Sequence, residues 1–206
     1  MFTDRTHAGT LLAEKLLPYK GNIDLILGLA RGGVVISAAI SRSLGIPHDV
    51  LIIKKIGSPG NPELAIGAVA PDAVFYIDDA LARSTGADET YIKETINRLT
   101  SIIKEKMHVY RKGKKPLNIQ HTSVILTDDG AATGATIYAA VHWAKKQQAK
   151  KIVVALPVAP QETIDRLKSL ADEVIVLATP TDFGAVGEFY REFPQITDEE
   201  VVELLT

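Results

Sequence analysis

Apolar runs of strand length alternate with segments of helical period along most of this chain of 206 residues. The run IDLILGLA (23–30) is followed by a helical pattern at 34–45, and HTSVILT (121–127) is followed by another at 135–148. Parallel strands need a crossover connection between them, which is usually a helix. The alternation therefore predicts an α/β fold with a mainly parallel central sheet flanked by helices.

The same criteria assign the rest of the chain. Further helices are predicted at 6–17, 88–109, 161–171 and 197–205, further strands at 48–56, 65–69, 73–77, 151–159 and 172–178, and loops at 57–63 (GSPGNPE) and 111–116 (RKGKKP). The two short strands at 65–69 and 73–77 are expected to pair. Thr197 with Glu200 forms a capping-box pattern at the start of the last helix. Nothing separates independent units, so residues 1–206 are predicted to form a single domain, with a core at about 6–178 and a tail at about 179–206.

Composition excludes several classes of function. The chain has no cysteine, which rules out disulfides, thiolate zinc sites and cysteine nucleophiles. Its net charge of -2 and pI of about 6.2 argue against a broad nucleic-acid surface. No uncharged apolar run approaches the roughly 20 residues that cross a bilayer, and the first residues lack a signal-peptide pattern. We therefore expect a cytoplasmic protein without nucleic-acid or membrane partners.

The segment VILTDDGAATGAT (124–136) combines two kinds of chemistry. Two carboxylates, Asp128 and Asp129, follow a buried strand, and a loop of small residues leads from them into a helix. Small residues let backbone N–H groups close on an anion, and a helix N-terminus adds partial positive charge. The residues of this predicted phosphate loop are Gly130, Ala131, Ala132, Thr133, Gly134, Ala135 and Thr136. The carboxylates suit hydroxyl groups or Mg²⁺, so a sugar with a 5-phosphate and free 2- and 3-hydroxyls satisfies both parts.

DDGAATGAT, preceded by an apolar strand, resembles the 5-phosphoribosyl-1-pyrophosphate (PRPP) motif of the type I phosphoribosyltransferases. The resemblance covers about 23–178 and extends to a group of predicted phosphoribosyltransferases whose acceptor is unassigned. It implies that the loop after the first strand, LARGG (29–33), holds pyrophosphate, that a basic pair in IIKKI assists, and that GSPGNPE is a flexible loop. The tail would be the family's hood over the base. The implied pyrophosphate residues are Ala30, Arg31, Gly32, Gly33, Lys54 and Lys55.

The implied reaction transfers ribose 5-phosphate from PRPP to a nitrogen acceptor, such as a nucleobase, and releases pyrophosphate. The resemblance assigns the ribose hydroxyls to the catalytic pair Asp128 and Asp129, directly or through Mg²⁺ that PRPP itself largely holds. Strand alternation places Lys54 and Lys55 on opposite faces, so one of them is expected to point into the site.

One position departs from part of the family. The hypoxanthine-guanine enzymes carry an Asp just before the Thr-Gly of the loop, where this chain has Ala132, as the adenine enzymes do. A 6-oxopurine acceptor is therefore disfavoured, and an acid or base must come from elsewhere, with Glu63 and Glu188 as candidates. Phe183, Phe189 and Tyr190 are candidates for stacking on a flat base, although packing alone would explain two of the three.

Other interpretations remain open at this stage. DDGAATGAT could be a polar turn that caps a helix, and RGG a plain tight turn. The cations of 111–116 are expected to form a solvated run, with closure over pyrophosphate as the alternative. Trp143 is predicted to pack in the core, His142 is given no role, and helix 88–109 is a candidate for homo-oligomer contacts. A PRPP-sensing regulator without turnover and a PRPP or sugar-phosphate hydrolase are the alternative functions. Dinucleotide, P-loop and nucleophile-elbow motifs are absent from the sequence.

Overall fold

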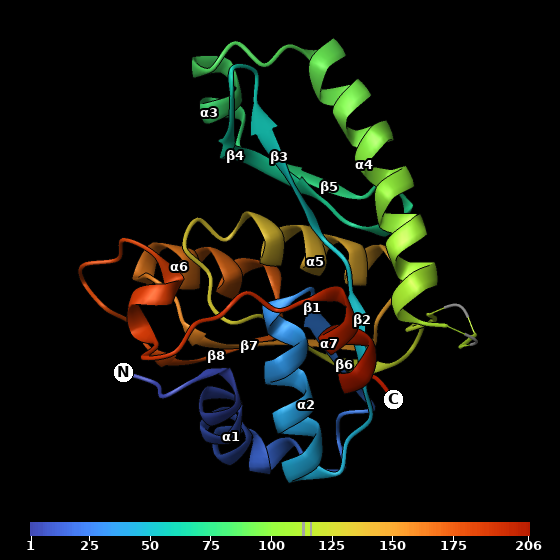
Figure 1. The fold of residues 1–206 in the computed structure, drawn as a ribbon, viewed down its shortest axis with the longest axis vertical. Coiled ribbons are helices and arrows are strands. Elements are labelled where there is room, and N and C mark those ends of the chain that lie inside the picture. Colours follow the sequence, from blue (N-terminus) through green and yellow to red (C-terminus); the bar gives the residue numbers. More distant parts are fainter. Residues whose placement is uncertain (113, 116) are drawn as a thin grey trace.

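A five-stranded parallel sheet forms the centre of the protein (Figure 1). The structure is a computed structural model that describes residues 1–112, 114–115 and 117–206. The strands, in spatial order, are β2 (His48–Leu51), β1 (Leu25–Leu29), β6 (Ser123–Thr127), β7 (Lys151–Val158) and β8 (Glu173–Ala178). Every neighbouring pair is parallel. The predicted α/β class is confirmed.

Helices cover both faces of this sheet, so β1, β2, β6 and β7 are largely buried, whereas the edge strand β8 is only partly buried. The helices α1 (Arg5–Leu16) and α2 (Gly32–Leu44) lie on one face, and α5 (Ala135–Lys146) and α6 (Gln161–Leu170) lie on the other (Figure 1). All five residues of β6 are buried, which explains why this strand reads as a continuous apolar run. No helix in the described part of the chain is both long and apolar enough to cross a membrane.

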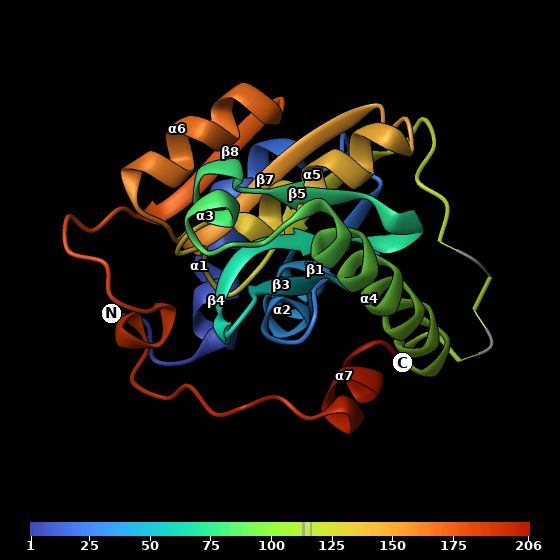
Figure 2. The ribbon, with the colours of Figure 1, turned by 90° about the horizontal axis from the view of Figure 1, so that it is seen from above.

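A second, antiparallel sheet stands over α5, with the long helix α4 (Glu89–Tyr110) beside it (Figures 1 and 2). Its strands are β3 (Lys54–Ser58), β4 (Asn61–Val69) and β5 (Phe75–Ile77), and the short helix α3 (Asp79–Ser84) follows them. The pairing of β4 with β5 confirms the expected pairing of the two short strands.

Two boundary predictions in this region are wrong. The single strand predicted at 48–56 is two strands, because the chain leaves the central sheet after Leu51 and joins the antiparallel sheet at Lys54. A continuous apolar run indicates extended backbone, but it does not indicate which partner strand the backbone pairs with. The predicted loop at 57–63 is largely a β-hairpin, in which Ser58 pairs with Asn61 around a turn at Pro59 and Gly60.

The C-terminal segment, residues 179–204, is an extended arm that crosses the carboxyl edge of the central sheet. It pairs with the N-terminus, where the Phe2 N–H donates to Phe189 O at 2.8 Å and the Arg191 N–H donates to Phe2 O at 2.9 Å. The arm ends in α7 (Asp198–Leu204), which packs on α2 and α4 through Val201. The predicted capping box is present at its start.

Arg111 is not part of a solvated charge run, contrary to the prediction for this basic segment. Its Nε lies 3.0 Å from both carboxylate oxygens of Asp49, and its Nη2 lies 2.8 Å from Oδ2. Both side chains are only 10% exposed. This ion pair ties the end of α4 to the edge strand β2. Lys112, by contrast, is exposed, and Gly113 and Pro116 of the predicted loop lie outside the described residues.

The substitution Arg111→Met is expected to lower the free energy of unfolding by about 3 kcal/mol, because it leaves the buried Asp49 carboxylate without a partner. The matched change Lys112→Met removes an equal charge from an exposed position, so it should stay within about 0.5 kcal/mol of the parent. Urea denaturation monitored by circular dichroism measures both. Equal stability of the two variants would show that the buried pair contributes nothing.

Candidate active site

Two loops meet at the carboxyl edge of the sheet because β1 and β6 are neighbours. Gly28 and Thr127 are register partners near the ends of these parallel strands, so the chain leaves both strands at the same place. The loop after β1 packs directly on the loop after β6. A Cβ on Gly33 would lie 2.6 Å from Thr127 O and 2.9 Å from Asp128 Cα, and one on Gly32 would collide with the Asp129 carboxylate. A side chain at Gly33 would require a backbone shift, and one at Gly32 would displace the side chains of Asp129 and Arg5.

One cavity of about 640 Å³ collects the residues that the sequence singled out. Every residue predicted to hold the phosphate, the ribose or the pyrophosphate lines it except Gly33, which packs against Thr127 and Asp128. Lys54 and Lys55 are both among the residues that line the cavity, although they are neighbours on a strand; that only one of the two side chains points into the site stays a prediction. The arm closes one side of the cavity with Gly184–Gly187 and Phe193.

The loop that precedes α5 offers a row of amide groups. Gly134 adopts a left-handed conformation, with φ of +76°, and α5 starts at the next residue. In the described part of the chain, the N–H groups of 132–136 have no hydrogen-bond partner. This is the arrangement that binds anions at helix N-termini. The N–H of Ala131 is not available, because it donates to Val158 O at 3.0 Å; the assignment of that amide to a phosphate is therefore wrong.

The two carboxylates are held differently. Asp129 Oδ2 lies 2.8 Å from Arg5 Nε, and its backbone carbonyl accepts a hydrogen bond of 2.6 Å from the Tyr190 hydroxyl. Asp128 Oδ1 accepts from the Asp129 N–H at 2.9 Å. Burial raises the pKa of both carboxyls, and the negative charge of Asp129 raises the pKa of Asp128 further. Arg5 opposes the shift of the Asp129 pKa, so Asp128 is the carboxyl that most readily holds a proton.

The structure adds Arg5 to the site, a residue that the sequence analysis did not select. Its side chain is 8% exposed, its Nη1 donates to Pro194 O at 2.7 Å, and its guanidinium lies 3.7 Å from the centre of the Phe193 ring. A signal existed in the sequence: Arg5 shares the helical face of Ala8, Leu12 and Leu16, all of which are buried. A cation on the apolar face of a helix indicates a buried partner.

The predicted aromatic residues mostly pack among themselves. The rings of Phe183 and Phe189 lie 5.0 Å apart, and Tyr190 packs between Phe2 and Phe193. Phe193, which the sequence analysis did not select, is the aromatic residue among those described as lining the cavity. The acid or base candidates Glu63 and Glu188 are exposed and are not among the lining residues. Trp143 is buried in the core, as predicted.

The carboxylate pair suits a magnesium ion that brings most of its own ligands. The described residues contain no group of three or more His, Cys, Asp or Glu side chains arranged to hold a metal. Asp128 and Asp129 supply carboxylate oxygens at the cavity wall. Mg²⁺ keeps several waters and commonly binds one or two carboxylates together with substrate phosphates. The donor set therefore fits Mg²⁺ bound jointly with a phosphorylated ligand.

Comparison with known proteins gives a consistent result. The model of the family described as "Phosphoribosyl transferase domain" matches residues 5–193. A Mycobacterium tuberculosis protein named "Putative phosphoribosyl transferase" is 38% identical over 205 residues, which is all of this chain and 46% of that protein. The chain thus spans about half the length of the curated relatives it matches.

Solved structures agree with the family match. The crystal structure of TT1426 from Thermus thermophilus is 40% identical, with a TM-score of 0.82 over 99% of this chain and 97% of that one. The AQ2163 protein from Aquifex aeolicus is 14% identical, with a TM-score of 0.52 over 84% of this chain and 73% of that one. At that identity the second likeness shows the fold alone.

The substitution Asp128→Asn is expected to stabilise the protein at neutral pH by about 1 kcal/mol. The pKa of Asp128 is raised in the folded state, so the folded protein binds more protons than the unfolded chain above the ordinary value of 3.8. Stability then falls as pH rises through this window. Asparagine removes that dependence and can still accept from the Asp129 N–H. Thermal melts from pH 4 to pH 8 should show a gain that shrinks toward pH 4, and a constant difference would contradict this account.

The substitution Arg5→Met is expected to cost roughly 3 kcal/mol of stability, because it strands the Asp129 carboxylate and removes the donor to Pro194 O. Adding Asp129→Asn should recover part of this loss, and the coupling energy of the double-mutant cycle measures the pair itself. Strict additivity in urea denaturation would show that the two side chains do not interact.

Proposed function

Because the chain belongs to the phosphoribosyltransferase family, we propose that it is a pentosyltransferase that transfers ribose 5-phosphate from PRPP to a nitrogen acceptor and releases pyrophosphate. The observation that carries this proposal is the juxtaposition of a row of free amides at a helix N-terminus with two carboxylates, Asp128 and Asp129, in one cavity. PRPP carries a 5-phosphate anion and a pair of hydroxyls on one sugar. The family match and the loop geometry support the assignment independently.

The 5-phosphate would bind at the start of α5. The N–H groups of 132–136 have no hydrogen-bond partner among the described residues, and these residues line the cavity. The hydroxyls of Thr133 and Thr136 add two donors. The aligned peptide dipoles of a helix of 12 residues favour negative charge at this end. Binding there fixes one end of the sugar without contact to the reacting carbon.

The ribose hydroxyls would be held by Asp128 and Asp129. Arg5 and Tyr190 position Asp129 through its carboxylate and its carbonyl respectively. Mg²⁺, when bound with the substrate, would neutralise negative charge on the pyrophosphate group next to these carboxylates. The protein's part is to hold the sugar in one orientation, which is a large share of the catalysis in a displacement that needs no side-chain nucleophile.

The pyrophosphate group would lie against the loop formed by Ala30, Arg31, Gly32 and Gly33. The missing side chains at Gly32 and Gly33 bring this loop close to the carboxylates, and Lys54 and Lys55 line the same cavity. Positive charge placed where negative charge develops on the leaving group lowers the barrier of the reaction. These residues would neutralise the departing pyrophosphate.

The acceptor would enter between the arm and the sugar site. Gly184–Gly187 and Phe193 line this side, which offers backbone groups and one aromatic face to a flat nitrogen heterocycle. We propose that the arm is the hood of the family and that residues 1–206 act as a single domain. Ala132 supplies no acid or base, which favours an acceptor whose nitrogen needs little proton transfer. Use of α4 in a homo-oligomer stays a prediction.

The direct test is pyrophosphate release from PRPP and Mg²⁺, with and without a pool of purine, pyrimidine and related heterocycles. The double variant Asp128→Asn, Asp129→Asn should lose activity by at least about 10³-fold, because both sugar contacts and charge compensation disappear. Asp165→Asn, on the exposed side of α6, is the matched control and should keep the parental rate.

Each outcome has a separate meaning. Release that depends on an acceptor and is lost in the double variant supports the transferase, and dividing the pool identifies the base. Release without acceptor would instead indicate a hydrolase. Tight PRPP binding without release would indicate a sensor, for which salt-dependent nucleic-acid binding is the further check. Absence of PRPP binding would overturn the assignment of the phosphate loop.

A further inference from the structure

A second cavity, of about 350 Å³, opens beside the first. It shares Arg31 and Lys54 with the larger cavity, and it adds Lys106 and Tyr110 from α4. The charged residues described as lining it are all cations: Arg31, Lys54 and Lys106. Neither Lys106 nor Tyr110 belongs to the segments that the sequence motifs singled out.

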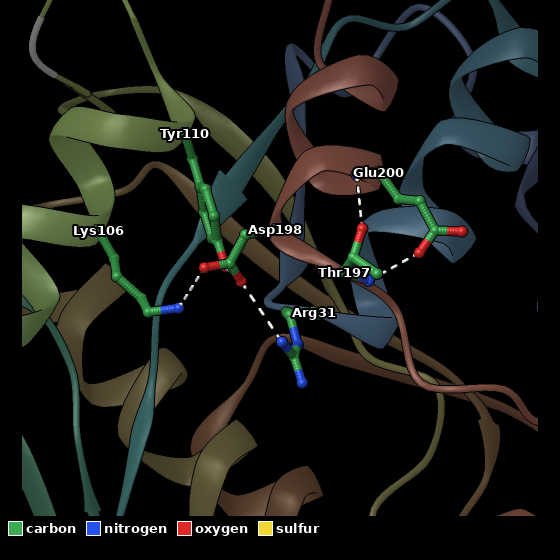
Figure 3. Close-up of polar contacts among 6 residues, drawn as sticks. All are labelled: Arg31, Lys106, Tyr110, Thr197, Asp198 and Glu200. Atoms are coloured by element: carbon green, nitrogen blue, oxygen red, sulfur yellow. Dashed lines mark hydrogen bonds and ion pairs between the residues drawn. The ribbon is translucent and has the colours of Figure 1, made fainter.

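A carboxylate from the far end of the chain is bound at this cluster (Figure 3). Asp198 Oδ2 lies 2.7 Å from Lys106 Nζ, and its Oδ1 lies 2.6 Å from the Tyr110 hydroxyl and 3.4 Å from Arg31 Nη1. Lys106 and Tyr110 lower the pKa of Asp198 to about 2, so it is an anion at physiological pH. It thus has the charge and the hydrogen-bonding pattern of one edge of a phosphate group.

The single carboxylate does not balance the cluster. Among the described residues, Asp198 is the one carboxylate within 4 Å of Arg31 or Lys106, and none lies that close to Lys54. Burial lowers the pKa of Lys54, and the charges of Lys106 and Arg31 lower it further. Three cations against one anion leave a net charge of about +2. A dianionic or more highly charged group would therefore be more favourable here than a carboxylate.

We propose that Arg31, Lys54, Lys106 and Tyr110 form an oxyanion site for the distal phosphate of the pyrophosphate group, and that Asp198 occupies it as a displaceable carboxylate when no ligand is bound. This inference rests on the proposed function, because it extends the pyrophosphate contacts from the Ala30–Gly33 loop to α4. The two cavities share the lining residues Ala30, Arg31, Ile53 and Lys54, so the proposed site adjoins the loop assigned to pyrophosphate.

The free energy needed to displace Asp198 is small because its contacts lie at the protein surface. The Asp198 side chain is 38% exposed and that of Arg31 is 43% exposed, and exposed ion pairs contribute little to stability. The helix α7 does not depend on them, since Thr197 and Glu200 cap it and Val201 anchors it (Figure 3). Asp198 can leave the cluster while the arm stays docked.

The test compares two pairs of variants by calorimetric titration with inorganic pyrophosphate. Asp198→Asn removes the competing charge and should tighten binding by about tenfold, whereas Lys106→Met should weaken it by about tenfold. Glu199→Gln removes an equal charge from the next, exposed residue, and Lys104→Met does the same on the exposed side of α4. Both controls should stay within about twofold of the parent. Ribose 5-phosphate, which lacks pyrophosphate, should bind all variants equally.

The results separate this proposal from the proposed function. The oxyanion site would be overturned if Asp198→Asn bound pyrophosphate as tightly as Glu199→Gln and Lys106→Met as tightly as Lys104→Met. This holds even if PRPP supports transfer. Undetectable pyrophosphate binding by the parent and by Asp198→Asn would overturn it as well. Opposite shifts in the two test variants, without any turnover of PRPP, would support the site and overturn the transferase. Thermal melts of each variant confirm that the proteins titrated are folded.

Discussion

The contact between the loops after β1 and β6 is the constraint on which the rest of the site depends. Gly32 and Gly33 leave no room for a side chain against Asp128 and Asp129, so the two loops meet at backbone distance. Gly28, on β1, is equally restricted, because a Cβ there would lie 2.5 Å from Gly33 O. A larger residue at any of these positions would push the loop after β1 away from the loop that carries Asp128 and Asp129. The absence of side chains at these glycines therefore sets the distance between the loop after β1 and the loop after β6.

Internal partners offset part of the charge that the site would present to a ligand. Arg5 pairs with Asp129, and Asp198 accepts from Lys106 and Arg31. These pairs keep groups of like sign close together. The energetic cost of that proximity is seen in the raised pKa of Asp128 and the lowered pKa of Lys54. Unfavourable burial of ionisable groups that converge on a cavity is typical of functional sites.

The antiparallel sheet and α4 form a separate support that brings cations to the edge of the central sheet. Lys54 begins β3, and Lys106 projects from α4 to the same cavity. The buried pair of Arg111 with Asp49 ties the end of α4 to β2. A helix attached at one end in this way holds Lys106 and Tyr110 at a fixed position relative to the loop at Ala30–Gly33. The arm completes the arrangement by crossing from β8 to α7 over the carboxyl edge (Figure 2).

The sequence by itself determined the alternation of strands with helices and, for β1 and β6, where the strands end. These are local properties, because the spacing of apolar residues and the position of small residues can be read without knowing any partner. The predicted loops of the site, 30–33 and 128–136, follow from them. Parallel strands end at the same edge of a sheet, but that β1 and β6 are neighbours there is known from the structure.

Only the tertiary structure decided which segments meet. The run at 48–56 has one apolar pattern but contributes a strand to each of two sheets. The spacing of apolar residues does not indicate which strand a segment pairs with. Phe193 lines the larger cavity, Lys106 lines the smaller one and Arg5 contacts Asp129, although all three lie far in the sequence from either motif. Their contacts depend on how helices and the arm pack over the sheet, which is a sum of many weak contacts between distant parts of the chain. No local pattern of residues records that sum.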